Sequence, residues 1–179
     1  MAEGEFERIA AALNAVGAAF TQSDHPAVRT SAEAAAMRGS SLSQGVKALV
    51  VKFKRKNTPS NEFFAVIALP ADCRLDFNKA KAVLKADEIK LASEAETVQQ
   101  TGCQPGGVPP FCHRNKLALL ADPTLFRQEE LDFNAGLPTR SIRLAAEGLK
   151  KAFDAYGVAY FDLKQDSEGE KTQKKKRHI

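Results

Sequence analysis

The chain has 179 residues, of which 44% are hydrophobic, and a formal net charge of +4. This length suits one ordinary domain, with or without an appendage. No apolar run is long enough to span a bilayer, and the acidic start MAEGEFER lacks the pattern of a signal peptide. Three scattered cysteines argue against a disulfide framework and favour a reducing, cytoplasmic location.

The positive charge is concentrated near the end of the chain. Residues 164–179 hold six Lys/Arg and three Asp/Glu, so +3 of the net +4 lies there. The composition also turns polar and charged at this point, which is typical of disorder. We therefore expect a folded domain over residues 1–163 and a disordered basic tail or linker over residues 164–179.

Hydrophobic periodicity distinguishes the expected helices from the expected strands. In chain order, the sequence predicts a helix over 3–17, a strand over 18–22, a helix over 31–38, strands over 46–53 and 62–69, a helix over 76–86, a strand over 88–92, a helix over 93–100, strands over 116–121, 130–134 and 139–144, a helix over 145–156 and a strand over 158–163. Ser31, Asp76 and Ser93 are the candidate N-caps, and Glu96 completes a capping box with Ser93. Hairpins mixed with short helices predict an α+β (mixed α/β) domain, with a largely antiparallel, barrel-like sheet surrounded by short helices.

A glycine- and proline-rich stretch, Thr101–His113 (TGCQPGGVPPFCH), is the most distinctive part of the sequence. Gly106 and Gly107 permit close backbone approach, while the flanking prolines stiffen both sides. Such a loop can present N–H groups to an anion or a polarised carbonyl. It has neither the Gly-Lys-Ser/Thr of a Walker loop nor a G-x-G-x-x-G fingerprint. A tight connection between two elements is the simpler interpretation.

Among single residues, Lys47 is the sharpest candidate for a functional role. It begins an apolar strand and shares a strand face with Leu49, Val51 and Phe53. A lysine there either snorkels at a strand end or lines a pocket as a cation for a phosphate or carbonyl oxygen.

Polar residues elsewhere carry weaker signals. His25 and Asn134 either satisfy their own turns or form the wall of a ligand site. Cys103, Cys112 and His113 lack the spacing of a zinc site, so no metal is expected. A Cys–His nucleophilic pair stays open without support.

Several stretches together resemble a known family. HPAVRTSAEAA, GVKALVVK, LPADCRLD, LASEAETVQQTGCQPGGVPPF and FNAG occur in the order seen in the YbaK/ProXp aminoacyl-tRNA deacylases, which are related to the editing domain of bacterial prolyl-tRNA synthetase. The resemblance runs from about His25 to about Leu144. It fits an N-terminal domain of a prolyl-tRNA synthetase from a eukaryotic microbe, or a free-standing protein.

The resemblance implies an α+β editing domain that hydrolyses the ester of mischarged tRNA, without a cofactor or a metal. The essential lysine of the family corresponds to Lys47, and its GxxxP loop to Gly106 and Pro110. Family members often have glycine where this chain has Cys112. The expected partners are the 3′ acceptor end of mischarged tRNA and prolyl-tRNA synthetase, in cis or in trans, with no membrane.

A mechanism follows in which backbone amides bind the acyl carbonyl oxygen and stabilise its developing negative charge. The expected catalytic residues are Lys47, Gly106, Gly107 and Val108, and the expected substrate-binding residues are His25, Thr30, Pro110 and Asn134. Lys47 would hold the terminal phosphate or the acyl end, and a water oriented by the ribose hydroxyl would attack. Steric exclusion of proline makes alanine on tRNA(Pro) the first expected substrate, with cysteine, serine and threonine open. The alternative is a non-catalytic tRNA- or synthetase-binding module with a vestigial pocket.

Overall fold

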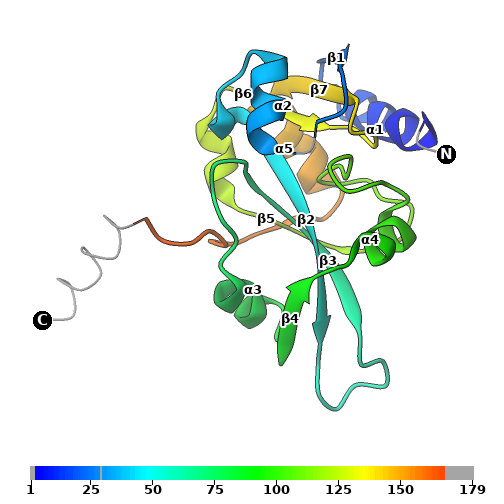
Figure 1. The fold of residues 1–179 in the computed structure, drawn as a ribbon, viewed down its shortest axis with the longest axis vertical. Coiled ribbons are helices and arrows are strands. Elements are labelled where there is room, and N and C mark those ends of the chain that lie inside the picture. Colours follow the sequence, from blue (N-terminus) through cyan, green and yellow to red (C-terminus); the bar gives the residue numbers. More distant parts are fainter. Residues whose placement is uncertain (1–2, 29, 168–179) are drawn as a thin grey trace, which may run out of the picture.

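The chain folds into two β-sheets with helices around them (Figure 1). The structure is a computed structural model that describes residues 3–28 and 30–167. Its elements are α1 (Glu3–Ala15), β1 (Phe20–Asp24), α2 (Ser31–Arg38), the 3₁₀ turn η1 (Leu42–Gln44), β2 (Val46–Lys54), β3 (Phe63–Pro70), α3 (Phe77–Val83), β4 (Glu88–Leu91), α4 (Glu94–Thr101), β5 (Ala118–Ala121), the 3₁₀ turn η2 (Pro123–Arg127), β6 (Glu130–Asn134), β7 (Arg140–Ala145), α5 (Ala146–Ala155) and β8 (Ala159–Tyr160). None of the helices in the described part of the chain is long and apolar enough to cross a membrane.

The smaller sheet has the order β1-β7-β6 and is antiparallel throughout. The larger has the order β4-β2-β3-β5-β8, with antiparallel pairing on both sides of β2 and parallel pairing on both sides of β5. A parallel bridge between Gly45 and Asp132 connects the two. The expected α+β class with largely antiparallel pairing is confirmed. The strands form two sheets because β1, β6 and β7 pair with one another, and the bridge at Asp132 of β6 is an isolated one.

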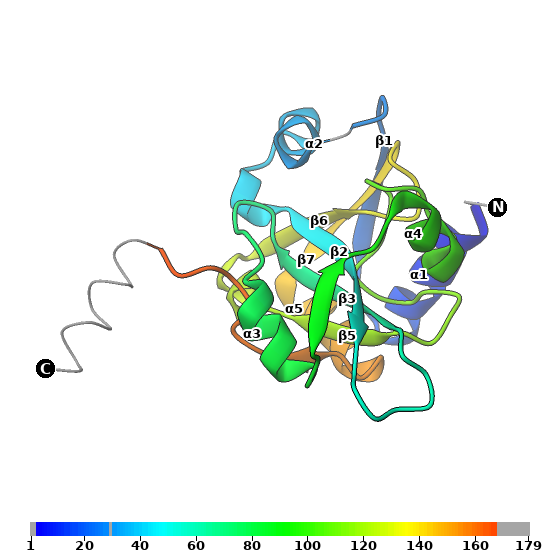
Figure 2. The same cartoon turned by 60° about the horizontal axis from the view of Figure 1, so that its bottom comes forward.

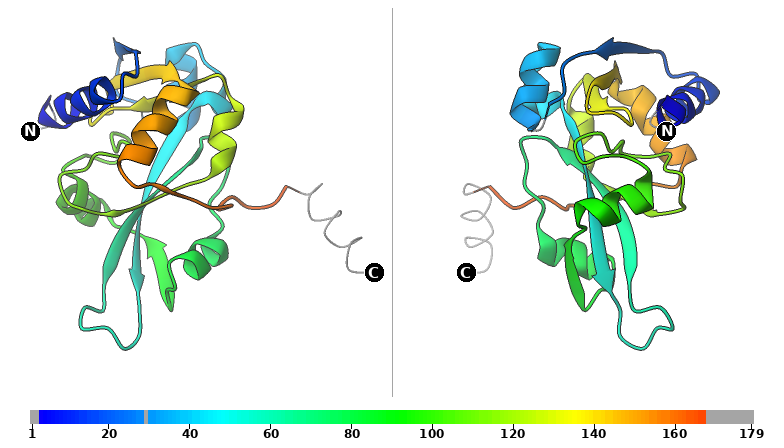
Figure 3. Two further views of the ribbon diagram at one scale, coloured as in Figure 1. Left: turned by 180° about the vertical axis from the view of Figure 1, so that it is seen from behind. Right: turned by 45° about the vertical axis from the view of Figure 1, so that its right-hand side comes forward.

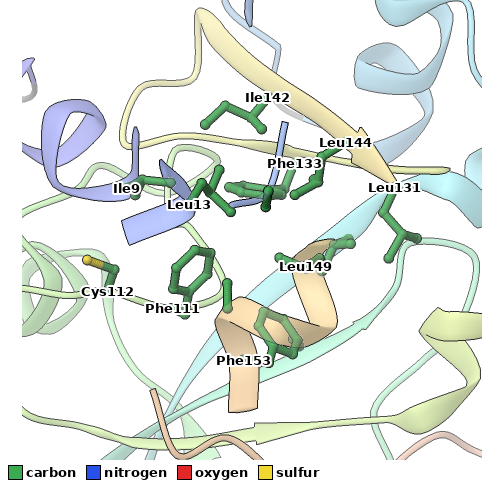
Figure 4. Packing of buried hydrophobic residues seen from close by; sticks show 14 of the residues in the cluster. Ile9, Leu13, Phe111, Cys112, Leu131, Phe133, Ile142, Leu144, Leu149 and Phe153 are labelled. Atoms are coloured by element: carbon green, nitrogen blue, oxygen red, sulfur yellow. The ribbon is translucent and has the colours of Figure 1, made fainter. Parts of the chain in front are cut away.

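Two hydrophobic clusters bury opposite faces of β3, as the two-residue period of a strand requires. Ala68 belongs to the cluster that lies between the sheets under α1 and α5; its large members include Ile9, Leu13, Phe111, Phe133, Leu149 and Phe153 (Figure 4). Ile67 and Leu69 belong to the other cluster, which α3 covers. Views from behind and from the side show α1 and α5 together at one end of the molecule, and α3 and β4 at the other (Figure 3).

Several element boundaries differ from those expected. Thr30, and not Ser31, caps α2, because its Oγ1 accepts from the Glu33 N–H at 3.1 Å and Glu33 returns a bond to the Thr30 N–H. The first strand lies two residues later than expected, at Phe20–Asp24, where it pairs with β7. The last strand is only Ala159–Tyr160, because its pairing with β5 spans two residues. The two 3₁₀ turns lie in segments for which the sequence predicted neither a helix nor a strand.

The folded body continues past the expected boundary at Leu163. Lys164 forms a bridge with Leu75, and the Gln165 N–H donates to the Arg74 carbonyl at 2.8 Å. The buried carboxylate of Asp122 accepts from the Lys164 N–H at 3.2 Å. The start of the expected tail is therefore part of the domain. The rest of that tail, residues 168–179, lies outside the described residues.

Candidate functional site

A cavity of about 210 Å³ opens between α2, the first half of β2 and the glycine loop, the name used below for Thr101–His113. Its lining residues come mainly from these three segments, and Figure 2 shows α2 near the start of β2. Five of the residues expected from the sequence line it: Thr30, Lys47, Gly106, Val108 and Asn134. Residues more than 80 positions apart in the chain are thus brought to one small cavity.

Three expected site residues do not line this cavity. Pro110 and Gly107 are buried in the loop behind it. The Gly107 N–H, expected as a donor to substrate, donates instead to the Gln104 carbonyl at 2.9 Å. The ring of His25 bonds through Nδ1 to the Pro26 carbonyl at 2.9 Å and through Nε2 to Ser141 Oγ at 2.7 Å, so both of its nitrogens already have protein partners.

Side chains alternate between the two faces of β2, as the sequence predicts. Lys47 lies on the face that α3 covers further along the strand. Its ammonium donates to the carbonyl oxygen of Cys73 and, at 3.5 Å, to that of Ala71. Burial, the largest effect, lowers the pKa of this ammonium, while nearby Cys73 and Asp72 act in the opposite direction. An ammonium has three N–H donors, so Lys47 keeps a donor for a group in the cavity.

Two glycines give the loop its shape for different reasons. Gly106 has a φ of +84°, in the left-handed region that side chains disfavour. Gly107 lies so close to the turn between β6 and β7 that an added Cβ would be 3.0 Å from the Leu137 carbonyl carbon. The Gly107 carbonyl accepts from the Gly136 N–H at 2.9 Å. The loop is thereby fixed on this turn.

Asn134 fixes the other carbonyl of the glycine pair. Its Nδ2 donates to the Gly106 carbonyl oxygen. The carbonyl oxygens of both glycines thus have partners in or next to β6. The backbone N–H groups of Gly106 and Val108, however, have no partner among the described residues. Both residues line the cavity. Two residues with unpaired backbone N–H groups therefore line the same cavity as Lys47.

Arg38, which sequence reasoning missed, organises the polar side of the cavity. It donates to Asp132 at 2.5 Å, to Asn134 Oδ1 at 2.5 Å and to Ser141 Oγ at 2.8 Å. Burial lowers its pKa, and Asp132 offsets part of this effect. Arg143 supports the pair of Arg38 and Asp132, because it donates to the Arg38 carbonyl at 2.8 Å and lies 3.4 Å from the Asp132 carboxylate. These residues hold Asn134 in one orientation, so Asn134 is a clamp for the loop as well as a wall of the cavity.

The cysteine and histidine that end the glycine loop do not form a catalytic pair. The Cys112 Sγ contacts Tyr156 Oη at 3.3 Å, and His113 Nε2–H donates to the Pro109 carbonyl at 2.7 Å. Burial lowers the pKa of His113 to about 4. Cys112 has a φ of +63°, in the left-handed region that favours glycine.

A second cavity, of about 200 Å³, adjoins the first. It extends from β2 toward α4, and four residues line both: Ala48, Leu49, Gly106 and Val108. Glu94 and Thr97 of α4 lie on its far side. The two unpaired N–H groups therefore belong to residues at the junction of two small compartments.

The chain is similar to several known proteins. Residues 25–152 match the family of aminoacyl-tRNA editing domains. The chain is 39% identical over 147 residues, 80% of this chain and 86% of the other, to an Escherichia coli K12 protein named multifunctional Ser/Thr-tRNA deacylase ProXp-y. It is 27% identical over 145 residues to a proline–tRNA ligase of Bacillus licheniformis, covering 81% of this chain and 23% of the ligase. A crystal structure of a candidate trans-editing enzyme for prolyl tRNA synthetase has a TM-score of 0.73 at 27% identity, covering 90% of this chain and 98% of that one.

Proposed function

The chain belongs to the family of aminoacyl-tRNA editing domains, and from this premise we propose that it is a deacylase that hydrolyses the ester of mischarged tRNA. One observation carries the proposal. Lys47 and two residues with unpaired backbone N–H groups, Gly106 and Val108, line a single small cavity. Ester hydrolysis needs donors aimed at an oxygen that gains negative charge in the transition state.

In this mechanism the acyl carbonyl oxygen accepts hydrogen bonds from the N–H groups of Gly106 and Val108. A water oxygen attacks the carbonyl carbon, the bond from that carbon to the ribose oxygen breaks, and the ribose oxygen takes a proton. Lys47 supplies positive charge to the same cavity and stabilises the reacting group through one N–H. Loss of a single oxyanion donor typically slows such a step by about two to three orders of magnitude.

The two compartments suggest how the substrate lies. The first cavity takes the amino acid, because its walls are short side chains from α2 and the segment before it: Val28, Thr30, Ser31 and Ala34. The second takes the terminal nucleoside, since its apolar walls suit a base and Glu94 at its edge disfavours phosphate. The ester then lies at the junction, beside Gly106 and Val108.

The amino acid is a small one. Alanine on tRNA(Pro), the first expectation from the sequence, fits a cavity of this size. The hydroxyl groups of Thr30 and Ser31 favour serine or threonine, because a site built to bond a hydroxyl discriminates strongly in favour of it. The name of the E. coli relative, a Ser/Thr-tRNA deacylase, supports the same preference for serine or threonine over alanine.

A deacylation assay tests the proposal. The purified protein is incubated with tRNAs charged with alanine, serine, threonine, cysteine or proline, and the loss of the ester is followed against buffer alone. The expected result is rapid hydrolysis of seryl- or threonyl-tRNA and survival of prolyl-tRNA(Pro). Lys47→Ala should reduce the rate at least about a hundredfold, while Lys116→Ala, an exposed lysine of the loop before β5, should leave it unchanged.

Two outcomes would contradict the proposal. If none of the charged tRNAs is hydrolysed above background, the cavity is not a deacylase site. If Lys47→Ala hydrolyses as fast as the unchanged protein, Lys47 has no part in the mechanism.

A further inference from the structure

The charge of the folded body is strongly divided between two regions. Residues 52–56 and 77–90 together contain eight Lys/Arg and two Asp/Glu. The rest of residues 1–163 contains twelve Lys/Arg and seventeen Asp/Glu. These two segments form one end of the molecule, where the end of β2 lies beside α3 and β4 (Figure 2). One end is therefore basic, although the body as a whole is nearly neutral.

Many of the basic side chains at this end are free to bind a partner. Lys54, Lys56, Lys81, Lys85 and Lys90 are exposed. Within residues 3–28 and 30–167, Lys81, Lys85 and Lys90 have no ion-pair partner. Lys54 and Lys56 have only exposed acidic neighbours, at 3.5 Å and 4.0 Å. Exposed ion pairs of that kind contribute little free energy, so both lysines remain available to a partner.

The strand register places like charges side by side. Lys52 of β2 is directly opposite Lys90 of β4, an arrangement that is unfavourable between neighbouring strands. Glu62 and Glu96 neutralise Lys52, at 2.9 Å and 2.7 Å. Lys90 has no such neighbour. A sheet edge that keeps an uncompensated lysine in this position fits an anionic partner.

The basic side chains surround a hollow of about 490 Å³ between α3, β2 and β4. Four lysines line it, Lys52, Lys54, Lys81 and Lys90, together with Phe77 and Asn78. The carboxylates of Glu62 and Glu88 also line it and pair with Lys52 and Lys54, so Lys81 and Lys90 are its unpaired cations among the described residues. Phe77 is 38% exposed, which is unusual for a large apolar side chain. Lysines around an exposed aromatic ring are what RNA-binding surfaces combine, because phosphates pair with the charges and bases or sugars stack on the ring.

We infer that this basic end, defined by Lys54, Lys56, Lys81, Lys85, Lys90 and Phe77, binds the phosphate backbone of the tRNA whose 3′ end enters the cavity. The inference rests on the proposed function for its choice of RNA. β2 connects the two places: Lys47 lines the cavity, and Phe53, on the same face of the strand, lines the hollow six residues further, about 20 Å along an extended strand. A bound acceptor arm can therefore reach both.

Charge reversal tests the inference without disturbing the core. The variant Lys81→Glu/Lys90→Glu is compared with Lys150→Glu/Lys151→Glu on α5, which changes the net charge equally, at exposed lysines away from α3 and β4 (Figure 3). Binding of uncharged tRNA is measured by fluorescence anisotropy at several salt concentrations. For the first variant we expect a Kd at least about tenfold higher and a salt slope smaller by about 2, one for each lost phosphate contact. The control should bind like the unchanged protein.

Hydrolysis assays separate this inference from the proposed function. Lys81→Glu/Lys90→Glu should raise KM for charged tRNA and leave kcat and the melting temperature unchanged, because neither lysine touches the cavity. If both variants bind tRNA equally well, the inference is wrong. Weaker binding of the first variant to an acidic protein such as a synthetase would not support it. If the protein binds tRNA through the basic end but hydrolyses no ester, the proposed function fails and the RNA-binding surface stands.

Discussion

The side-chain amide of Asn134 donates to the carbonyl oxygen of Gly106, and so ties the end of β6 to the glycine loop. The other end of the same amide accepts from Arg38 at 2.5 Å and from Ser141 at 3.0 Å. Both ends of Asn134 are thus engaged within the protein. Its main effect on catalysis should be to hold the loop so that the N–H groups of Gly106 and Val108 face the cavity.

Asn134→Ala should therefore lower kcat for deacylation by about ten- to a hundredfold, because a misplaced oxyanion donor loses most of its effect. KM should change less than kcat, since the other residues that line the cavity remain. Asn134→Asp is the matched variant: it keeps an acceptor for Arg38 but sets a carboxylate oxygen against the Gly106 carbonyl, so it should lower kcat at least as much. Single-turnover rates check both. An Asn134→Ala protein with an unchanged kcat would show that the loop holds its shape without this clamp.

The sequence predicted much of the site because its signals are local. A glycine pair between prolines predicts a loop of special backbone geometry, and a lysine on an apolar strand face predicts a cation near a pocket. The Ser93 capping box and the Asp76 cap were also predicted correctly, because capping depends on neighbouring residues.

Arg38 could not be predicted in the same way. Its partners Asp132, Asn134 and Ser141 are 94, 96 and 103 positions away in the chain, and only the packing of α2 against the smaller sheet brings them together. At the end of an alanine-rich helix it resembles any exposed arginine. The loss of Gly107 as a donor, by contrast, has a local origin: Gln104-Pro105-Gly106-Gly107 has proline and glycine at the central positions of a type II turn, whose hydrogen bond uses the Gly107 N–H.

Arg38 and Asp132 form a buried ion pair whose single members should be hard to replace. Their side chains are 7% and 1% exposed. Arg38→Met should destabilise the protein by about 3–5 kcal/mol, because it leaves the Asp132 carboxylate buried with only Arg143 beside it. Arg38→Met/Asp132→Leu should cost clearly less than the sum of the two single variants. Urea unfolding of all four proteins measures the coupling, and additive free energies would show that the pair does not act as a unit.

The stability of the protein should fall in mild acid because of His113. Burial lowers its pKa from 6.5 to about 4, and its Nδ1 is buried without a hydrogen-bond partner in the described structure. Between these pH values the unfolded chain binds a proton at His113 that the folded chain excludes, so stability rises with pH from about 4 to 6.5 and is lost as pH falls. Over this pH range the free energy of unfolding should change by on the order of 3 kcal/mol.

His113→Gln removes this titration, and the Nε2–H of the glutamine can still donate to the Pro109 carbonyl. The unfolding free energy of the variant should therefore change less between pH 6.5 and pH 4 than that of the unchanged protein. His25→Gln is the control, because the ring of His25 is only part-buried and both of its nitrogens have protein partners. Parallel pH profiles for the unchanged protein and His113→Gln would contradict the assignment.

The end of the folded domain can be located by two truncations. A chain that ends after Leu163, the boundary expected from composition, loses the Lys164 N–H that donates to Asp122 and the Gln165 N–H that donates to Arg74. It also loses Asp166, which pairs with Lys79 at 2.8 Å. At about 0.5–1.5 kcal/mol for each lost hydrogen bond, the unfolding free energy should fall by about 2–3 kcal/mol. A chain that ends after Ser167 keeps all of these contacts and should unfold like the full protein.

The shorter truncation should also slow deacylation, because of where the lost contacts lie. Arg74 and Leu75, which pair with Gln165 and Lys164, directly follow Cys73, whose carbonyl holds the Lys47 ammonium. Loosening this segment should misplace Lys47 and lower kcat, while the chain that ends after Ser167 should keep the full rate. Melting curves and single-turnover assays on both truncations decide the matter. If the chain that ends at Leu163 is as stable and as active as the full protein, the contacts of residues 164–166 contribute nothing, and the domain ends where its composition changes.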